Sequence, residues 1–202
     1  MKTAGGPPEL VLASGSPRRR ELLASLGWSF SVVLPEADEE FMPGEAPDEG
    51  VMRISRDKAL SVARAHPKRW VVAADTVVVA KGRILGKPES REEALSMLEL
   101  LNGAVHCVYT GLTVAAPRGA ETAAEVTEVV FRRLSREALE AYAESGEGDD
   151  KAGAYAIQGR GALMVEAIRG DYFNVVGLPL CRLGAMVESL GFSLADQWRN
   201  SR

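Results

Sequence analysis

The feature that most constrains the fold of this chain is a continuous apolar run, Trp-Val-Val-Ala-Ala, at residues 70–74. A strand with one face in water alternates apolar and polar residues, so a run without alternation predicts a strand that is buried on both faces. Such strands lie at the centre of sheets that helices cover on both sides. The run stops at Asp75, which we therefore expect at the carboxyl end of this strand, where α/β sheets place their ligands.

Strand-like and helix-like segments alternate along the rest of the chain. Apolar runs predict strands at residues 10–13, 30–34, 105–115, 125–131 and 162–168, and a hairpin over residues 77–85. Helical periodicity predicts helices at residues 17–27, 48–66, 91–101, 136–145 and 179–190. Two strand-rich stretches interrupt the alternation, so we expect an α/β fold with a mixed central sheet flanked by helices.

Composition indicates one folded unit. The chain has 202 residues, 46% of them hydrophobic and 26% charged, which suits a single domain with a sizeable core and two lobes. We expect this domain to span residues 1–202, with an ordered core over about residues 9–192 and frayed ends up to Pro8 and after Gln197. The net charge of -4 provides no basic field for a nucleic-acid backbone or an anionic membrane, so any anion site must be local.

The expected compartment is the cytoplasm. No run of 18 apolar residues occurs, and the opening MKTAGGPPEL has no continuous apolar segment of the kind that a secretory signal needs. Cys107 and Cys181 lie far apart without a CxxC or Cys/His cluster, which favours two inert thiols in a reducing compartment over a disulfide or a zinc site. We expect no membrane span and no nucleic-acid partner.

The segment SGSPRRR, after the first predicted strand, has the features of an anion site. Ser16 is a suitable N-cap and Pro17 a suitable first helical residue, so free backbone N–H groups and the positive end of a helix dipole meet there. Arg18 and Arg19 add guanidinium groups that bind phosphate through paired hydrogen bonds. A capped helix with solvated arginines is an equally good interpretation of these residues alone. The segment matches neither the Walker A nor the GxGxxG pattern.

The candidate catalytic groups are carboxylates and lysines. Asp75 after a buried strand needs a partner for its charge, which suits a metal ligand or a base, although it could instead cap the next turn. Glu39 lies in an acidic segment that could simply be solvated, and Lys58, Lys87 and Lys151 taken singly are typical of surface lysines. The only histidines, His66 and His106, share no ligand-like spacing, so hydrolysis would depend on carboxylates, water and a hard cation.

A series of motifs resembles those of the Maf family, in order and over nearly the whole chain. They are LVLASGSPRRRELL at residues 10–23, DEE at 38–40, RDKAL at 56–60, AADTVVV at 73–79, LGKP at 85–88, DKAGAYAIQGRG at 150–161 and VVGLPL at 175–180. One departure is Ala156, where similar sequences often have glycine; the added methyl group changes no hydrogen-bond donor or acceptor.

The resemblance implies a nucleotide pyrophosphatase with an elongated, two-lobed α/β fold related to the inosine triphosphatases. It further implies a homodimer that uses Mg²⁺ or Mn²⁺. The implied substrates are dTTP, UTP and modified pyrimidine nucleotides, which such an enzyme removes in cleaning nucleotide pools. The family is also associated with inhibition of septum formation. By this resemblance Asp75 is the proton acceptor and, with Glu39, a metal ligand. The implied substrate-binding residues are Ser14, Ser16, Arg18, Arg19, Lys58, Thr76, Lys87 and Gln158.

Two alternatives remain open at this point. The chain could bind a nucleotide as a regulator of cell division without turning it over, or it could be a nucleotidyltransferase that requires an acceptor. For the base, the amide of Gln158 offers both a donor and an acceptor, which can match the carbonyl and N–H edge of uracil or thymine. Equally, that amide could only bond to its own glycine-rich loop.

Overall fold

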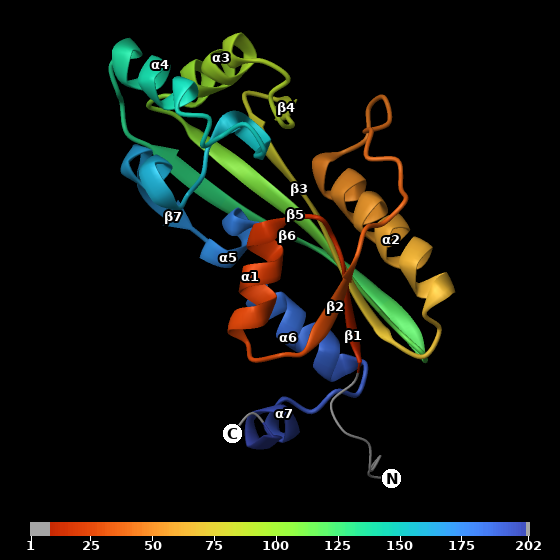
Figure 1. Cartoon of the computed structure of the whole chain (residues 1–202). Helices are drawn as coiled ribbons and strands as arrows, with labels where there is room; N and C mark the ends of the chain where they lie inside the picture. Colours follow the sequence, from red (N-terminus) through yellow and green to blue (C-terminus); the bar gives the residue numbers. More distant parts are fainter. Residues whose placement is uncertain (1–8, 201–202) are drawn as a thin grey trace.

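The computed structural model describes residues 9–200, which form a seven-stranded mixed sheet (Figure 1). The strand order is β2-β1-β3-β5-β6-β7, with β4 paired to β3. The strands are β1 (Leu10–Ala13), β2 (Phe30–Val33), β3 (Trp70–Ala80), β4 (Arg83–Leu85), β5 (Val105–Ala116), β6 (Gly119–Phe131) and β7 (Val165–Arg169). Only the pairings of β1 with β2 and with β3 are parallel among these strands. The expected mixed α/β sheet is therefore confirmed.

Helices cover both faces of the sheet (Figure 1). One long helix, α2 (Pro47–Ala65), lies on one face. On the other face, α1 (Pro17–Ser25) and α6 (Leu180–Ser189) pack at the end near β1, whereas α3 (Arg91–Leu101) and α4 (Arg136–Glu144) pack at the far end of the long strands. Two short helices, α5 (Tyr172–Val176) and α7 (Leu194–Asn200), lie before and after α6 in the chain. Within the described residues, no helix is both long and apolar enough to cross a membrane.

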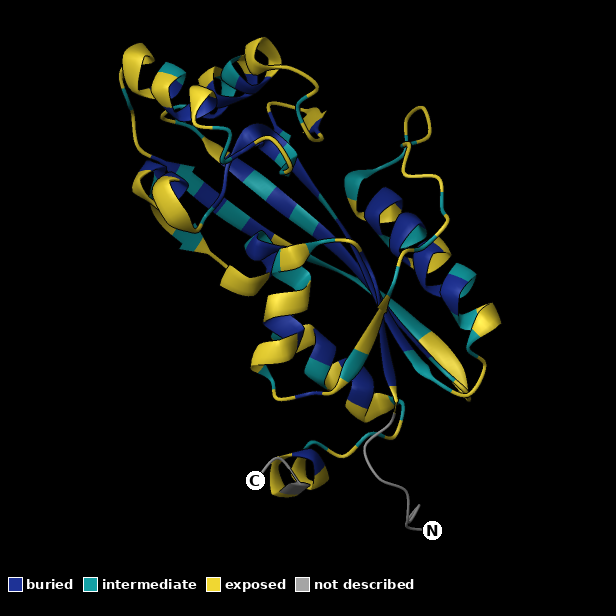
Figure 2. Ribbon diagram, viewed as in Figure 1, coloured by how far each residue is buried: buried dark blue, intermediate teal, exposed yellow. Residues whose placement is uncertain are grey.

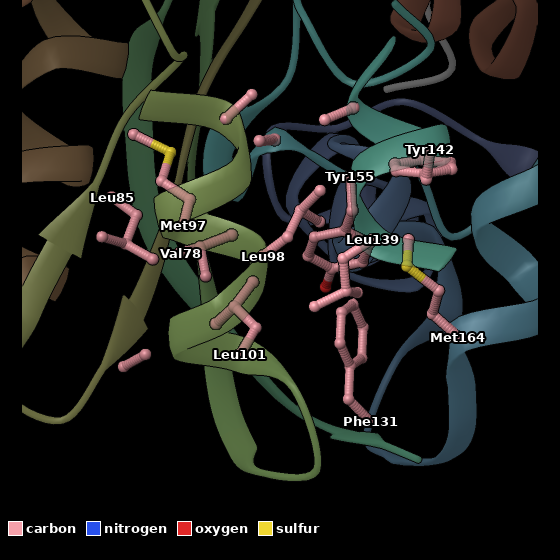
Figure 3. Close-up of a cluster of buried hydrophobic side chains, with 14 of the residues drawn as sticks. Val78, Leu85, Met97, Leu98, Leu101, Phe131, Leu139, Tyr142, Tyr155 and Met164 are labelled. Atoms are coloured by element: carbon pink, nitrogen blue, oxygen red, sulfur yellow. The ribbon is translucent and has the colours of Figure 1, made fainter. Parts of the chain in front are cut away.

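The alternation of side chains along β3 divides the core. Val71 and Ala73 face α2, whereas Val72 and Ala74 face α1 and α6. Farther along the same strand, Val78 joins the cluster beneath α3 and α4, which Figure 3 shows. The central strands are accordingly buried and the outer helix surfaces exposed (Figure 2).

Gly111 in β5 lets α2 approach the sheet at backbone distance. A Cβ atom at this position would lie 2.0 Å from the carbonyl oxygen of Val51, so any other residue would force the helix outward. Lys58 follows Val51 by about two helical turns, which directs its side chain toward the same sheet. Asp75 is the register partner of Gly111, and the close approach therefore brings Lys58 and Asp75 together.

Several expected boundaries were wrong. β3 does not end at Asp75 but continues to Ala80, because β5 pairs with it from Val71 to Val79 and gives every residue a partner. The expected strand at 162–168 begins with a 3-10 helix, η2 (Gly159–Met164), before β7. The loop after β7 contains the unpredicted α5.

The end of the chain also differs from the expectation. Residues after Gln197 were expected to fray, but α7 continues to Asn200. The side chain of Gln197 is buried and donates to the Leu26 carbonyl at 3.1 Å, which ties this helix to the end of α1. The same expectation for residues 1–8 and 201–202 lies outside the described residues.

We predict that His106 makes stability sensitive to acid. This side chain is buried between Phe131 and Tyr155, and burial lowers its pKa to about 4. The unfolded chain binds a proton near pH 6.5, so acidification from about pH 7.5 to about pH 4.5 should cost roughly 2–3 kcal/mol of unfolding free energy. Urea titrations of the protein and of His106→Leu would measure this difference. The variant also loses the 2.9 Å hydrogen bond between Nε2 of His106 and the Tyr155 hydroxyl, but it does so at every pH. Equal pH dependence of the unfolding free energy in the two proteins would therefore contradict the prediction.

Candidate active site

The candidate site lies at an uncovered edge of β3. On this edge, β1 pairs with β3 only as far as Val72, and β4 begins to pair at Val78. A cleft of about 840 Å³ opens between these two points. Asp75 is therefore inside a strand, but it still lies beyond the carboxyl end of the parallel strand β1, as ligand sites in α/β sheets do.

All ten residues expected at the site line this one cleft: Ser14, Ser16, Arg18, Arg19, Glu39, Lys58, Asp75, Thr76, Lys87 and Gln158. Asp75 and Thr76 are neighbours whose side chains leave opposite faces of β3, so the cleft wraps around the strand edge. Their positions agree with the expected roles, and the roles themselves stay predictions.

The SGSPRRR segment forms the expected capped helix start. The hydroxyl of Ser16 accepts from the Arg19 backbone N–H at 3.4 Å, and Pro17 is the first residue of α1. The Ser16 N–H in turn donates to the buried hydroxyl of Ser14 at 3.2 Å. The loop is thus held with the positive end of α1 directed at the cleft, where an anion would be stabilised.

Arg19 ties three elements together. Its Nε donates to the Gly177 carbonyl at 2.8 Å, one terminal nitrogen donates to Ser14 at 3.3 Å, and the other donates to Thr76 at 3.0 Å. The Thr76 hydroxyl also bonds to Thr110, at 2.9 Å. Burial lowers the pKa of Arg19, while the charges of Asp75 and Glu39 act in the opposite direction. Much of the hydrogen-bonding capacity of Arg19 therefore serves to position Thr76 and the loop.

A buried ion pair joins α2 to β3. The Lys58 ammonium lies 2.8 Å from Oδ1 of Asp75 and 2.9 Å from Oε1 of Glu39. The side chains of Lys58 and Asp75 are only 6% and 11% exposed, whereas that of Glu39 is 58% exposed. Lys58 is therefore no surface lysine, and the acidic loop reaches the cleft through Glu39.

Arg18 reaches across the cleft to the segment after α4. It donates to the Asp150 carboxylate at 2.9 Å and to the Asp150 carbonyl at 3.4 Å. Lys151, which resembled a surface lysine, also lines the cleft and pairs with Asp150 at 2.5 Å. By contrast, Lys87 and Gln158 are exposed at the cleft, and the side chain of Gln158 does not cap η2.

Sequence reasoning missed Asp150, Lys151 and the carbonyl of Gly177 as parts of the site. The first two open the DKAGAY segment, so that motif was a usable signal. Every residue has a backbone carbonyl, so no residue type identifies the Gly177 carbonyl as a hydrogen-bond partner. Its contact with Arg19 depends on the fold. Counted together, the lining residues supply five cationic side chains and three carboxylates, a local positive excess in an acidic chain.

These features define a site for a multiply charged oxyanion beside a buried carboxylate. Residues 9–190 match the model of the Maf-like protein family, and the chain belongs to that family. It is 50% identical over 192 residues to the dTTP/UTP pyrophosphatase of Myxococcus xanthus (strain DK1622), covering 95% of this chain and 96% of that protein. It is 44% identical over 185 residues to the dTTP/UTP pyrophosphatase of Bacillus pumilus (strain SAFR-032), covering 92% and 98%.

Among solved structures, a nucleoside-triphosphatase (dITP/XTP pyrophosphatase) from Mycobacterium abscessus is similar over 92% of this chain and 100% of that chain. The TM-score is 0.43 and the identity 13%. At this TM-score and identity, we draw no conclusion about this chain from the similarity.

We predict that Arg19→Lys lowers the unfolding free energy by about 1–3 kcal/mol, because an ammonium cannot reproduce three divergent hydrogen bonds from one planar group. Arg20→Lys, on the exposed side of the same helix, is the matched control and should change stability little. Denaturant titrations of both variants provide the measurement. Equal, small effects would show that the three contacts of Arg19 contribute little.

Proposed function

We propose that this protein hydrolyses dTTP and UTP to the nucleoside monophosphate and pyrophosphate. The observation that carries the proposal is the buried Lys58–Asp75 pair, set in one cleft with the capped SGSPRRR loop and an excess of cationic side chains. A carboxylate beside a polyphosphate site suits proton abstraction from water during attack on phosphorus. Membership of the Maf-like family and the two pyrophosphatase relatives support the same reaction.

In this proposal Asp75 is the general base. Its contact with Lys58 uses Oδ1, which leaves Oδ2 to accept a proton from water. The water oxygen forms a bond to the α-phosphorus while the bond from that phosphorus to the bridging oxygen breaks. The proton goes to Asp75 and pyrophosphate leaves. Lys58 holds the carboxylate in one orientation throughout, because the pair is fixed between α2 and β3.

The phosphates would bind at the start of α1. The neutral donors are the Ser16 hydroxyl and the backbone N–H of Arg18. Pro17 has no N–H, and the Arg19 N–H already donates to Ser16. Arg18 and Lys87 provide charge at the open side of the cleft. Arg18 is bound to Asp150, so phosphate would compete with that carboxylate.

Because Arg19 is engaged by Ser14, Thr76 and Gly177, we assign it mainly a supporting part in phosphate binding.

A hard divalent cation, Mg²⁺ or Mn²⁺, is part of the proposal. Within residues 9–200, no group of three or more His, Cys, Asp or Glu side chains could hold a metal. The two carboxylates at Lys58, those of Glu39 and Asp75, nevertheless fit a cation that takes its remaining ligands from phosphates and water, as Mg²⁺ commonly does. When bound there, such a cation would neutralise charge on the phosphates.

Base recognition is assigned to Gln158. Its amide is exposed at the cleft and does not cap its own loop, which favours an amide available to the base. We include in the proposal a homodimer in the cytoplasm, which the family resemblance implies. A nucleotide-binding regulator without turnover is the weaker alternative, because Asp75 and Lys58 are both present and paired. A nucleotidyltransferase would transfer the nucleotide to an acceptor substrate, so release of free monophosphate in water alone would count against it.

The proposal is tested by pyrophosphate release from UTP, dTTP, CTP, ATP, GTP and 7-methyl-GTP, with Mg²⁺ and with excess EDTA. We expect UTP and dTTP to have the highest kcat/KM, free monophosphate as the second product, and no turnover in EDTA. Faster hydrolysis of a purine nucleotide would contradict the assigned base. Full activity in EDTA would remove the cation from the proposal, and absence of hydrolysis throughout would overturn the enzymatic function.

We predict that Asp75→Asn lowers kcat by about 10² to 10⁴ while UTP still binds, because the amide keeps the shape but cannot accept the proton. Asp57→Asn is the matched control, since Asp57 is exposed on α2 next to Lys58 and should leave kcat unchanged. Single-turnover rates and UTP binding by calorimetry separate the two effects. If the Asp75→Asn variant kept more than about a tenth of the original rate, another group would have to be the base.

A further inference from the structure

The loop that carries Gln158 is held by a carboxylate that itself lies outside the cleft lining. Residues 156–161 include two glycines and run into the first turn of η2, and Gln158 is exposed in their middle. A loop of this composition has little intrinsic preference for one conformation. Something else must therefore fix where the Gln158 amide points.

Glu147, just after α4, makes the contacts that fix this loop. Its Oε1 accepts from the Gly161 N–H at 2.9 Å, and its Oε2 accepts from the Arg160 N–H at 3.1 Å. Both donors lie within three residues of Gln158. One side chain thus binds two successive backbone groups, which defines the orientation of the loop more strictly than a single contact would.

Tyr142, which lies on α4 and is labelled in Figure 3, extends the network into the core. Its hydroxyl donates to Oε1 of Glu147 at 3.2 Å and accepts from the Ala156 N–H at 3.1 Å. The loop is therefore held on both sides of Gln158, at residue 156 by Tyr142 and at residues 160 and 161 by Glu147.

Gly159 and Gly161 are needed because the loop backbone lies close to the side chains of Glu147 and Tyr142. Gly159 has a φ of 65°, and a Cβ there would lie 3.0 Å from a carboxylate oxygen of Glu147. At Gly161 a Cβ would lie 2.2 Å from the Ala156 carbonyl and 2.8 Å from the Tyr142 hydroxyl. The loop is thus shaped to close around these two side chains.

We propose that Glu147 is a positioning residue for base recognition: it holds the Gln158 loop so that the amide meets the nucleotide base. Glu147 touches neither substrate nor reacting atoms in this role. The inference rests on the proposed function and deepens it, because it divides the cleft into a phosphate end, set by α1 and α2, and a base end, set by Glu147 and Tyr142.

The charge of Glu147 suits this role. Partial burial opposes ionisation, but the N–H groups of Gly161 and Arg160 and the Tyr142 hydroxyl outweigh it, so the pKa of Glu147 lies below its ordinary value. The residue is therefore an ionised acceptor near neutral pH, when backbone N–H groups bind a carboxylate most strongly.

The test compares Glu147→Gln with Glu140→Gln. In the first variant an NH₂ group replaces one acceptor oxygen and faces a backbone donor. In the second, the half-exposed Glu140 loses its charge and with it the ion pair to Arg136 on α4. Two quantities are measured: KM and kcat for UTP, and the Ki of inorganic tripolyphosphate, which has no base. We expect Glu147→Gln to raise the KM for UTP by about tenfold with little change in kcat or Ki, and Glu140→Gln to change none of them.

Coupling to Gln158 completes the test. In a Gln158→Ala background, Glu147→Gln should raise the KM for UTP by less than about twofold, because the amide that it positions is gone. Tyr142→Phe, which keeps the ring in the core, should shift KM in the same direction even if Glu147→Gln folds poorly. An unchanged KM in both single variants, a parallel rise in KM and Ki, or equal effects with and without Gln158 would overturn the inference. Absence of UTP hydrolysis by the unmodified protein would instead overturn the proposed function.

Discussion

The site depends on one buried ion pair, between Lys58 on α2 and Asp75 on β3. Moving both charges out of water is costly, and a buried pair of this kind often stabilises a fold no better than apolar residues of similar size would. Loss of either partner would leave the other charge buried and unpaired, which is more costly still. Its presence is therefore better explained by chemistry than by stability, since Lys58 fixes the orientation of Asp75 through Oδ1 and does not use Oδ2.

The rest of the structure brings this pair together. Gly111 allows α2 to lie at backbone distance from β5, and β5 keeps β3 extended through Asp75. The end of β1 and the start of β4 leave the edge of β3 uncovered beside the pair. Because side chains alternate along a strand, Asp75 meets α2 on one face while Thr76 meets Arg19 on the other. Side chains from helices on both faces of the sheet therefore line the same cleft.

Local signals predicted the parts of this structure that depend on neighbouring residues. The Ser16 cap, Pro17 at the helix start and the mixed sheet were confirmed, because caps and periodicity are properties of short segments. The end of a strand at Asp75 was wrong, since a buried carboxylate is tolerated there only by its pairing with a lysine from another element. Arg18 with Asp150 and Arg19 with Gly177 join residues more than a hundred positions apart, and no local pattern predicts such pairs.

The groups proposed for catalysis and phosphate binding and the loop proposed for base recognition depend on different parts of the fold. Proton transfer by Asp75 and the phosphate contacts of Ser16 and Arg18 depend on α1, α2 and β3, which pack on the clusters near β1. The Gln158 loop instead depends on Tyr142, which belongs to the cluster beneath α3 and α4. Effects of substitutions in groups that share no partners are usually additive. The base end could therefore change its preference without disturbing the Lys58–Asp75 pair. Within residues 9–200, the side-chain hydrogen bonds of Glu147 and Tyr142 go to each other and to the Gln158 loop, and none goes to that pair.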